Sequence, residues 1–342
     1  MWNVTGKGFI AKSQRALVIG LLGLSVLSAC QHKGSLKIIP CEILSAFNEY
    51  PDSSFFSNIS SMCYQEGYLY LFDTKRGDIA VKGIDKDSFF TIGQIGQAPF
   101  ELANPTTFTI NEKGCIAVLD IGSLSLKYFQ GKEWISSLPI PSGGESHFFI
   151  YQDTTYLTLP TDTTCYIRVP SSWERGSIER VDFCGMTHRI TELDDMNLLR
   201  NRRHLIKGNQ CLYTVCASYP IIEKYDLHTN QLLATIDLSK LDYLDEVCKF
   251  VKEGEDSPKS FYVFLRDACF YDGKLYILFA DWKDGYTVNK IIVLEDNGTF
   301  SPLCIYQLPG NIYTSFTIGN HCIYAFNHEY SEVQTISLVD FH

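Results

Sequence analysis

The run GYLYLFD at residues 67–73 is a short apolar and aromatic stretch that begins at a turn residue and ends on an aspartate. Five runs of the same kind follow it: GCIAVLD (114–120), DTTYLTL (153–159), QCLYTVC (210–216), GKLYILF (273–279) and HCIYAFN (321–327). Aligned, the six runs place Tyr70, Ala117, Tyr156, Tyr213, Tyr276 and Tyr324 in one column. Their spacing is roughly that of a four-stranded propeller blade, about 40 to 50 residues. The sequence therefore predicts an all-β fold, a six-bladed β-propeller.

Further apolar stretches flank each run. One precedes it, as in FTIN (108–111), HFFIY (147–151), CFYD (269–272) and SFTIG (315–319), and two follow it, as in SLKYFQ (125–130) and WISSLPI (134–140). Strands joined by hairpins in this order predict four-stranded antiparallel blades. The last repeat ends soon after its third strand, so its fourth strand must come from elsewhere. We expect the N-terminal segment LKIIP (36–40) to pair there and close the ring.

Two insertions, residues 177–207 and 239–259, interrupt the repeat. In the second, Ser239 is placed to cap a helix, and the apolar residues of that helix fall on one face. These residues are Leu241, Leu244, Val247, Cys248 and Val251. We expect short helical insertions, with this stripe packed on the propeller.

Eleven cysteines follow Cys30, and none belongs to a Cys-x-x-Cys pair. Cys115, Cys211 and Cys322 occupy one column of the repeat, and Cys63 and Cys269 occupy another. Equivalent positions in blades that are not neighbours lie too far apart for a disulfide, which needs Cα atoms about 5.5 Å apart. We therefore expect the cysteines to act as small buried hydrophobic residues.

Residues 1–29 have the features of a lipoprotein signal peptide. Lys7, Lys12 and Arg15 precede the apolar segment ALVIGLLGLSVL (16–27), which at about 18 Å as a helix is short for a membrane span. The ending Leu27-Ser28-Ala29-Cys30 resembles a bacterial lipobox, which implies that Cys30 is lipidated and becomes the mature N-terminus. An uncleaved anchor and plain secretion are the alternatives. The predicted organisation is signal peptide 1–29, tether 30–35 and propeller 36–342.

The formal net charge of the chain is −10, and the signal peptide carries three positive charges and no negative one. The mature chain is therefore more acidic still, which disfavours binding to nucleic acid or to anionic lipid surfaces. The expected membrane link is the lipid on Cys30. The tether lacks the acidic run that resembles a surface-export signal. We expect the periplasmic side of the outer membrane, with the cell surface as the alternative.

The stretch IGQIGQAPFELANPTTFTI (92–110) connects the first two repeats. A strand follows it rather than a helix N-terminus with a nearby cation, so it does not predict a phosphate-binding loop. Together with the strands after it, the stretch resembles an NHL-type repeat. Gly93, Gly96 and Glu101 resemble the linker of the six-bladed (NHL/TolB-like) propeller lipoproteins of Gram-negative bacteria, which usually reads Gly-x-Gly-Pro-Gly-Glu. Ala98 and Phe100 stand here in place of two of those glycines. The resemblance implies the fold and the anchoring, and its sharp motifs lie within residues 62–130.

Polar residues close several of the aligned runs. Asp73, Asp120 and Asn327 end their runs, and Asp281 follows its run by two residues. In a propeller these positions share one face around the axis, where oxygen ligands would suit Ca²⁺ or a polar ligand. The alternative is turn chemistry, in which each side chain bonds its own backbone. Beyond an axial Ca²⁺ the sequence predicts no cofactor.

A second set of candidates lies at the predicted rim: Phe100, Glu101, Arg200, Arg202, Arg203 and His204. The basic residues, with Lys207, could hold an anionic ligand, or they could neutralise Glu192, Asp194 and Asp195. His147, His188, His204 and His328 are the histidines that could reach the axial face or the first insertion; the alternative is a structural or surface role.

The sequence contains no Gly-x-Ser-x-Gly motif and no His-Glu-x-x-His motif, so no catalytic residue is predicted. Rigid blades that carry variable loops favour a binding or scaffold module for a protein or small-molecule partner. The alternative is a metal-dependent propeller enzyme, a lyase, lactonase or hydrolase. Such an enzyme requires at least three carboxylate or imidazole groups that converge near the axis.

Overall fold

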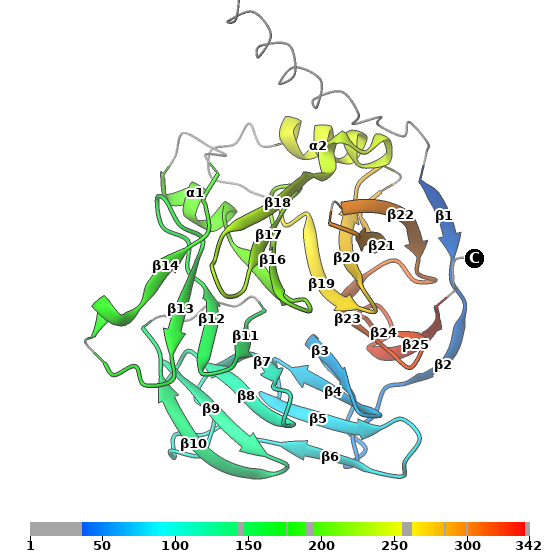
Figure 1. Cartoon of the computed structure of the whole chain (residues 1–342). Helices are drawn as coiled ribbons and strands as arrows, with labels where there is room; N and C mark the ends of the chain where they lie inside the picture. Colours follow the sequence, from blue (N-terminus) through cyan, green and yellow to red (C-terminus); the bar gives the residue numbers. More distant parts are fainter. Residues whose placement is uncertain are drawn as a thin grey trace, which may run out of the picture. The chain divides into compact units, whose positions relative to one another are not determined.

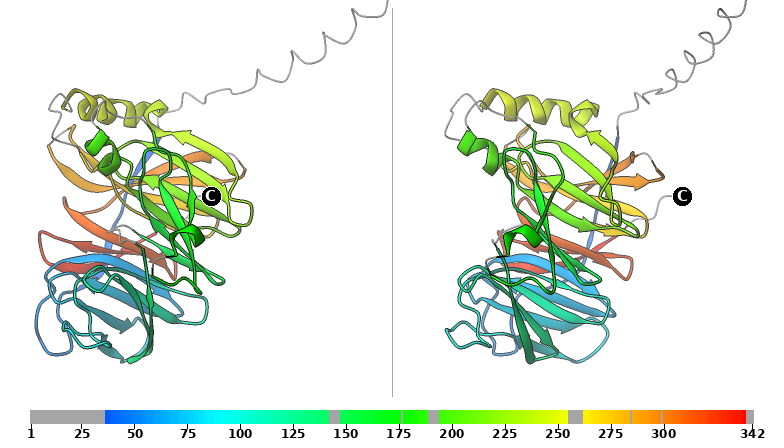
Figure 2. Two further views of the ribbon diagram at one scale, coloured as in Figure 1. Left: turned by 90° about the vertical axis from the view of Figure 1, so that its left-hand side faces the viewer. Right: turned by 60° about the vertical axis from the view of Figure 1, so that its left-hand side comes forward.

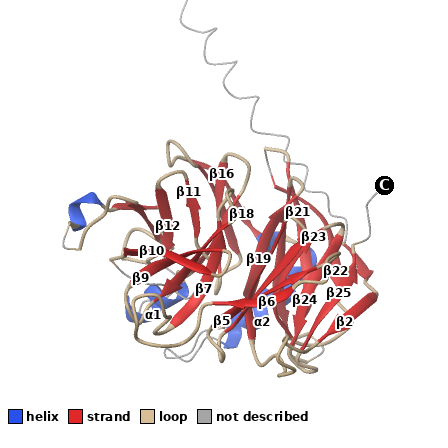
Figure 3. Cartoon of the chain, turned by 90° about the horizontal axis from the view of Figure 1, so that it is seen from below, coloured by secondary structure: helices blue, strands red, loops and turns tan. Residues whose placement is uncertain are grey.

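A computed structural model describes residues 36–141, 147–175, 177–188, 194–254, 262–283, 285–298 and 300–338. The predicted signal peptide and tether, with Cys30, lie outside these residues. Six mainly antiparallel sheets form a ring (Figure 1), which confirms the six-bladed propeller. Strands make up most of the described chain, and helices are few and short (Figure 3).

Apart from two N-terminal strands, each blade is built from strands that follow one another in the sequence. Blades one to three contain β3 (Ile59–Gln65), β4 (Tyr68–Asp73), β5 (Asp78–Gly83) and β6 (Phe89–Ile92); β7 (Pro105–Ile110), β8 (Cys115–Asp120), β9 (Ser125–Gln130) and β10 (Glu133–Pro139); and β11 (Phe149–Tyr151), β12 (Thr154–Thr158), β13 (Tyr166–Pro170) and β14 (Asp182–Cys184). Blades four to six contain β15 (Arg203–Lys207), β16 (Cys211–Cys216), β17 (Ile221–Asp226) and β18 (Leu232–Asp237); β19 (Leu265–Tyr271), β20 (Lys274–Asp281), β21 (Thr287–Asp296) and β22 (Phe300–Gln307); and β23 (Tyr313–Gly319), β24 (Cys322–Asn327) and β25 (Glu332–Ser337). The labelled first strands, such as β3, β7 and β19, lie toward the axis (Figure 1). The six aligned runs of the sequence are the second strands of the six blades.

The ring is closed by an N-terminal strand, as predicted, but the segment that closes it is not LKIIP. β2 (Ile43–Phe47) pairs antiparallel with β25 and supplies the fourth strand of blade six. LKIIP contributes β1 (Lys37–Pro40), which pairs parallel with β22 and extends blade five to five strands. Prediction of LKIIP as the closing strand was therefore wrong by one element, because two short strands follow one another here and only the second reaches blade six.

The hydrophobic core lies between the blades. Buried side chains form six clusters in the described residues, and each cluster joins one pair of neighbouring blades. Ile116 and Val118 of β8, for example, pack with Val81 of β5 between blades one and two. Since both faces of most blades are covered by a neighbour, the strands are apolar on both faces, which explains the near-continuous apolar runs in the sequence.

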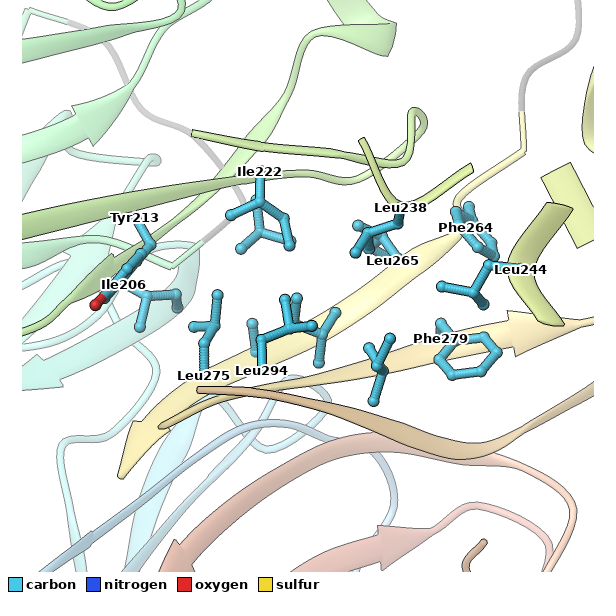
Figure 4. Packing of buried hydrophobic residues seen from close by; sticks show 14 of the residues in the cluster. Ile206, Tyr213, Ile222, Leu238, Leu244, Phe264, Leu265, Leu275, Phe279 and Leu294 are labelled. Atoms are coloured by element: carbon cyan, nitrogen blue, oxygen red, sulfur yellow. The ribbon is translucent and has the colours of Figure 1, made fainter. Parts of the chain in front are cut away.

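The second insertion forms the short 3₁₀ helix η2 (Leu238–Lys240) and the helix α2 (Asp242–Gly254). Leu244, Val247 and Cys248 are buried against Phe264 and Phe279, in the cluster between blades four and five (Figure 4). The predicted apolar stripe is confirmed for these residues. Ser239 does not cap α2; its hydroxyl donates to Asp237 Oδ1 at 2.6 Å.

The connector between blades one and two runs from β6 to β7, as the sequence predicts. Gly93 has a φ of +77°, and a Cβ on Gly96 would lie 1.9 Å from the Glu101 carboxylate. Glu101 accepts hydrogen bonds from Ala98 N and Gln94 Nε2, each at 2.8 Å. The glycines therefore let the loop fold around its own glutamate.

The first insertion contains η1 (Ile178–Arg180) and the helix α1 (Asp194–Arg200). Both α1 and α2 precede a first strand and lie toward the same face of the ring (Figure 2). The eleven cysteines of the described residues form no disulfide, as predicted. Of the five cysteines that share columns of the repeat, only Cys211 is buried, so the expectation of burial was wrong for Cys63, Cys115, Cys269 and Cys322, which are partly exposed. No helix among the described residues is long and apolar enough to span a membrane.

Candidate functional site

The four candidate axial ligands are the last residues of the second strands β4, β8, β20 and β24, so they share one face of the ring, and they hydrogen-bond to nearby backbone. Asp73 Oδ1 accepts from Lys75 N at 2.9 Å, and Asn327 Oδ1 accepts from Glu329 N at 2.9 Å. Asp120 accepts from Gly122 N and from Asn104 N, and Asp281 accepts from Lys283 N. All four are buried. The structure therefore supports turn chemistry for these residues.

These side chains also tie neighbouring segments together. The carboxylate of Asp120 joins the turn after β8 to the connector that enters β7, through Ala103 N at 3.0 Å and Asn104 N at 2.7 Å. It also lies 3.2 Å from Nζ of Lys127, whose side chain is buried. Burial alone would raise the pKa of Asp120, but these hydrogen bonds outweigh it and hold the pKa below its usual value.

A cavity of about 430 Å³ opens at the axis on this same face. Every blade contributes a polar side chain to its lining: Ser60, Thr106, His147, His204, Arg266 and Thr314. Asn58, Thr74, Asn104, Pro105 and Thr107 complete the lining. We call this cavity the axial pocket; none of the four predicted axial ligands lines it.

Four of the six side chains occupy β-bulges. Ser60, Thr106, Arg266 and Thr314 are the second residues of β3, β7, β19 and β23, and strand pairing skips each of them. A bulge adds an unpaired residue to one strand and redirects its side chain, a device found near binding sites. In four blades the repeat therefore delivers a polar side chain from the same strand position to the axial pocket.

The residue after each bulged position is also polar and is buried: Ser61, Thr107, Asp267 and Ser315. These residues bond neighbouring first strands to one another. Thr107 Oγ1 donates to Ser61 Oγ at 3.4 Å, and Ser315 Oγ donates to the carbonyl of Ile59 at 2.8 Å. A satisfied polar layer thus holds the first strands together beside the axial pocket.

Two histidines line the axial pocket, and a buried carboxylate, that of Asp267, lies behind one of them. Nε2 of His147 makes a hydrogen bond to Oδ1 of Asp267, whose Oδ2 accepts from Phe316 N at 2.8 Å. The ring of His204 lies 5.4 Å from that of His147. Both ring nitrogens of His204 are buried, and neither makes a hydrogen bond of ordinary geometry within the described residues, although backbone of Leu265 lies near enough to favour a proton on the ring.

Their pKa values are driven apart. Burial would lower the pKa of His147, but the charge and hydrogen bond of Asp267 outweigh it and raise the pKa above its usual value. Burial, together with the neighbouring His147, lowers the pKa of His204 to about 4. At neutral pH His204 is therefore a neutral ring with open hydrogen-bonding capacity.

Arg266 is the one arginine or lysine that the described residues contribute to the lining. No carboxylate of the described residues lies within 4.0 Å of its guanidinium, and the charge of Arg266 contributes to lowering the pKa of His204. The carboxylate nearest in sequence, that of Asp267, is already bonded to His147, to Phe316 N and to Ala268 N. Arg266 thus brings an unbalanced positive charge to the axial pocket.

The predicted rim residues lie in different environments. His204 does line the axial pocket, but Arg200 and Arg203 are buried, so the prediction that they lie at the rim is wrong. Arg203 Nε lies 4.0 Å from the buried carboxylate of Glu223, which also bonds His188 at 2.8 Å. Glu101 accepts a hydrogen bond within its own loop, and Phe100 is half exposed. Glu101, Phe100 and Arg202 do not line the axial pocket.

Three other sequence candidates are located as follows. Lys207 pairs with Glu112, His188 with Glu223, and His328 is exposed. Glu192 lies outside the described residues, as do the side chains of Asp194 and Asp195. No group of three or more His, Cys, Asp or Glu side chains in the described residues is arranged to hold a metal ion.

Sequence reasoning missed Ser60, Thr106, Arg266 and Thr314. Their signal is a recurring polar pair placed directly after an apolar residue or proline: ISS (59–61), PTT (105–107), LRD (265–267) and YTS (313–315). These pairs interrupt the alternation expected of a strand, so the first strands were predicted to begin too late. The interruption is the bulge itself.

The fold and the axial pocket together define a six-bladed β-propeller with a polar axial site. No model of a known protein family matches the sequence, and no curated protein matches it. Among solved structures, the chain is similar to a presumptive exported protein of Bacteroides fragilis, at 13% identity and a TM-score of 0.56, covering 89% of this chain and 100% of that one. It is also similar to a catalytically inactive histidine-to-alanine variant of virginiamycin B lyase from Staphylococcus aureus, solved with quinupristin, at 10% identity and a TM-score of 0.51, covering 86% and 99%. At these identities the likeness concerns the fold.

Proposed function

We propose that this chain is a lipid-anchored, periplasm-facing binding module that takes a small polar molecule into the axial pocket. The observation that carries the proposal is the convergence of one polar side chain from each of six blades on a cavity of about 430 Å³. Ligand pockets in proteins span about 300 to 1,000 Å³, so the cavity is large enough for a small molecule. Its polar lining suits a ligand that forms many hydrogen bonds.

The extracytoplasmic location rests on the sequence features of residues 1–30. The basic and apolar segments, followed by Leu-Ser-Ala-Cys, support export and lipidation of Cys30 in the outer membrane. The similar propeller of Bacteroides fragilis carries the description of an exported protein, in agreement with this location. Metabolic labelling with an acyl chain analogue, followed by membrane fractionation, should label and sediment the wild-type chain. A Cys30→Ser variant that is equally labelled would contradict the anchor.

Binding is tested by filling the axial pocket. Thr314 lines the cavity, whereas Thr163 is an exposed threonine outside it. The full chain, purified in a neutral detergent, would be screened by thermal shift against small carboxylates, phosphates, sugars and amines. We expect a compound that stabilises the wild type and Thr163→Trp but not Thr314→Trp, with both variants folded by circular dichroism. Equal stabilisation of both variants would place the ligand elsewhere.

One observation favours a second function, an enzyme that acts in the same pocket. A histidine held by a buried carboxylate is the arrangement of a general base, and His147 and Asp267 form such a pair beside His204. A metal-dependent lyase, lactonase or hydrolase would further need three convergent ligands, a condition that the described residues do not meet. Turnover of a compound found in the screen, lost in His147→Gln while binding persists, would support the enzyme. Unchanged turnover in that variant would exclude His147 as its base.

A further inference from the structure

We propose that the ligand of the axial pocket carries an oxyanion group, which the guanidinium of Arg266 and the ring of His204 hold. This inference rests on the proposed function, because it names the chemical class of the molecule that the pocket takes.

The charge of the lining is the first observation. Among the described residues, the lining contains Arg266 and two histidines but no aspartate or glutamate. Asp267 lies behind His147 and is bonded to it, so this carboxylate offsets the charge of His147 and not that of Arg266. A chain of net charge −10 therefore presents a positive hollow at its axis. Such a hollow attracts an anion against the field of the rest of the protein.

The second observation is the open hydrogen-bonding capacity of the lining. Arg266 offers up to five N–H donors and forms no ion pair among the described residues. The buried hydroxyl of Ser60 and both buried ring nitrogens of His204 also make no hydrogen bond there. Buried polar groups are normally bonded, and those that are not commonly mark a place for a ligand or ordered water. An oxyanion accepts hydrogen bonds from all three kinds of group.

The third observation is that Arg266 is kept from pairing with its own neighbour. Asp267 follows Arg266 directly, yet its two oxygens are occupied by His147 from blade three and by backbone N–H groups of Ala268 and Phe316. The bulge at Arg266 separates the two residues in the strand pairing. An arginine that is left free in this way is suited to bind a planar or tetrahedral oxyanion.

The inference also predicts a coupling to pH. The charged and titratable groups that face His204 are His147 from blade three and Arg266 and Asp267 from β19, and the first two disfavour a proton on His204. A bound anion would counter them and raise the pKa of His204. Binding then takes up a proton, so the affinity rises as the pH falls toward the pKa of His204.

The probes are sodium sulfate and sodium acetate, one tetrahedral and one planar, with ethanolamine and glycerol as cationic and neutral comparisons. The full chain in neutral detergent would be titrated by calorimetry at constant ionic strength. We expect both anions to bind at pH 6, and Arg266→Gln to weaken them about tenfold or more. Arg180→Gln is the matched control, since Arg180 is exposed and lies outside the pocket. It should bind as the wild type does.

Sulfate keeps its charge between pH 5 and 8, so it isolates the contribution of the protein. We expect its affinity to rise several-fold from pH 7.5 to pH 5.5, and His204→Gln to flatten this dependence. Anion binding that is equal in Arg266→Gln and Arg180→Gln would overturn the inference. Binding of glycerol or ethanolamine alone, blocked by Thr314→Trp, would also overturn it while leaving the binding module intact. If Thr314→Trp, which fills the pocket, left the affinity for all four probes unchanged, the proposed binding module itself would fail.

Discussion

Two sets of polar residues lie within one residue of each other on the same face of the propeller, and they do different work. Asp73 pairs directly across from Ile59, and Ser60 follows Ile59 at the bulge. The aspartate is buried and its oxygens accept several hydrogen bonds, whereas the hydroxyl of Ser60 makes none. The same contrast separates Asp120 from Arg266. Position near the axis therefore does not separate the two sets, whereas unfilled hydrogen-bonding capacity distinguishes Ser60 from Asp73.

The largest expected effect is that of Asp120→Ala. This change removes four hydrogen bonds and one ion pair, and it leaves Lys127 buried without its carboxylate partner. Loss of one member of a buried ion pair costs about 3 to 5 kcal/mol. We expect a loss of this size in the free energy of unfolding, measured by urea denaturation. The double variant Asp120→Ala/Lys127→Met should recover part of it. A loss below 1 kcal/mol would mean that the aspartate turns are not structural.

A smaller loss is expected for Asp73→Ala. Its carboxylate accepts from the hydroxyl of Tyr50 at 3.1 Å and from Ser57 N at 2.8 Å, and the described residues place no cation within 4.0 Å of it. Because no buried cation loses its partner in this variant, the loss in the free energy of unfolding is that of leaving buried donors unsatisfied, about 1 to 3 kcal/mol. Tyr50→Phe is the matched partial change and should cost less. If Asp73→Ala instead changed sulfate binding as Arg266→Gln does, the division between the two sets would fail.

The fold could be predicted from the sequence because its cause is repeated. Each second strand is a largely apolar run, and six recurrences of this run indicate the repeat more clearly than any single run could. The closing strand could not be assigned, since LKIIP and ILSAF are both short and apolar, and the choice depends on which of them reaches β25. Only the path of the chain around the rim decides that.

The site was less predictable for a physical reason. An aspartate at a strand end has the same sequence pattern whether it binds a ligand or its own turn, and only the backbone geometry at Asp73 and Asp120 separates the two cases. Arg200 and Arg203 seemed exposed as part of a basic cluster, but Glu223, twenty residues later, provides a buried partner for Arg203. His204, a candidate from the sequence, lines the axial pocket, whereas Arg266 was not a candidate because its bulge lies before the expected start of β19.

The pH dependence of stability should separate the two sets as well. The folded pKa of His204 is about 4, below the usual 6.5, so unfolded chains bind the proton more readily. The stability that His204 contributes is therefore complete above pH 6.5 and is lost as the pH falls toward 4. Because the ring is partly exposed to the pocket, we expect about 1 to 2 kcal/mol rather than the full shift.

Urea denaturation at pH 7 and pH 4.5 measures this loss, and His204→Gln should reduce it. The pKa of Asp120 is held below its usual value, so the stability that it contributes is lost only in more acidic solution, as the pH falls through the folded pKa. His147, with a raised pKa, acts in the opposite direction: its contribution is present below pH 6.5 and is lost as the pH rises. If His204→Gln lost as much free energy of unfolding between pH 7 and pH 4.5 as the wild type does, the pH dependence would come from other groups.

The smallest expected effect is that of Ser60→Ala, and it bears most directly on the comparison. The hydroxyl of Ser60 is buried and makes no hydrogen bond within the described residues, so its removal should change the free energy of unfolding by less than about 0.5 kcal/mol in either direction. Ser315→Ala is the matched serine in the satisfied layer, where the hydroxyl donates to Ile59 at 2.8 Å, and it should cost about 1 kcal/mol or more. Sulfate titration should give the reverse order: we expect Ser60→Ala to bind sulfate more weakly than Ser315→Ala does. A stability loss in Ser60→Ala equal to that in Ser315→Ala would show that the bulge serine serves the fold and not the pocket.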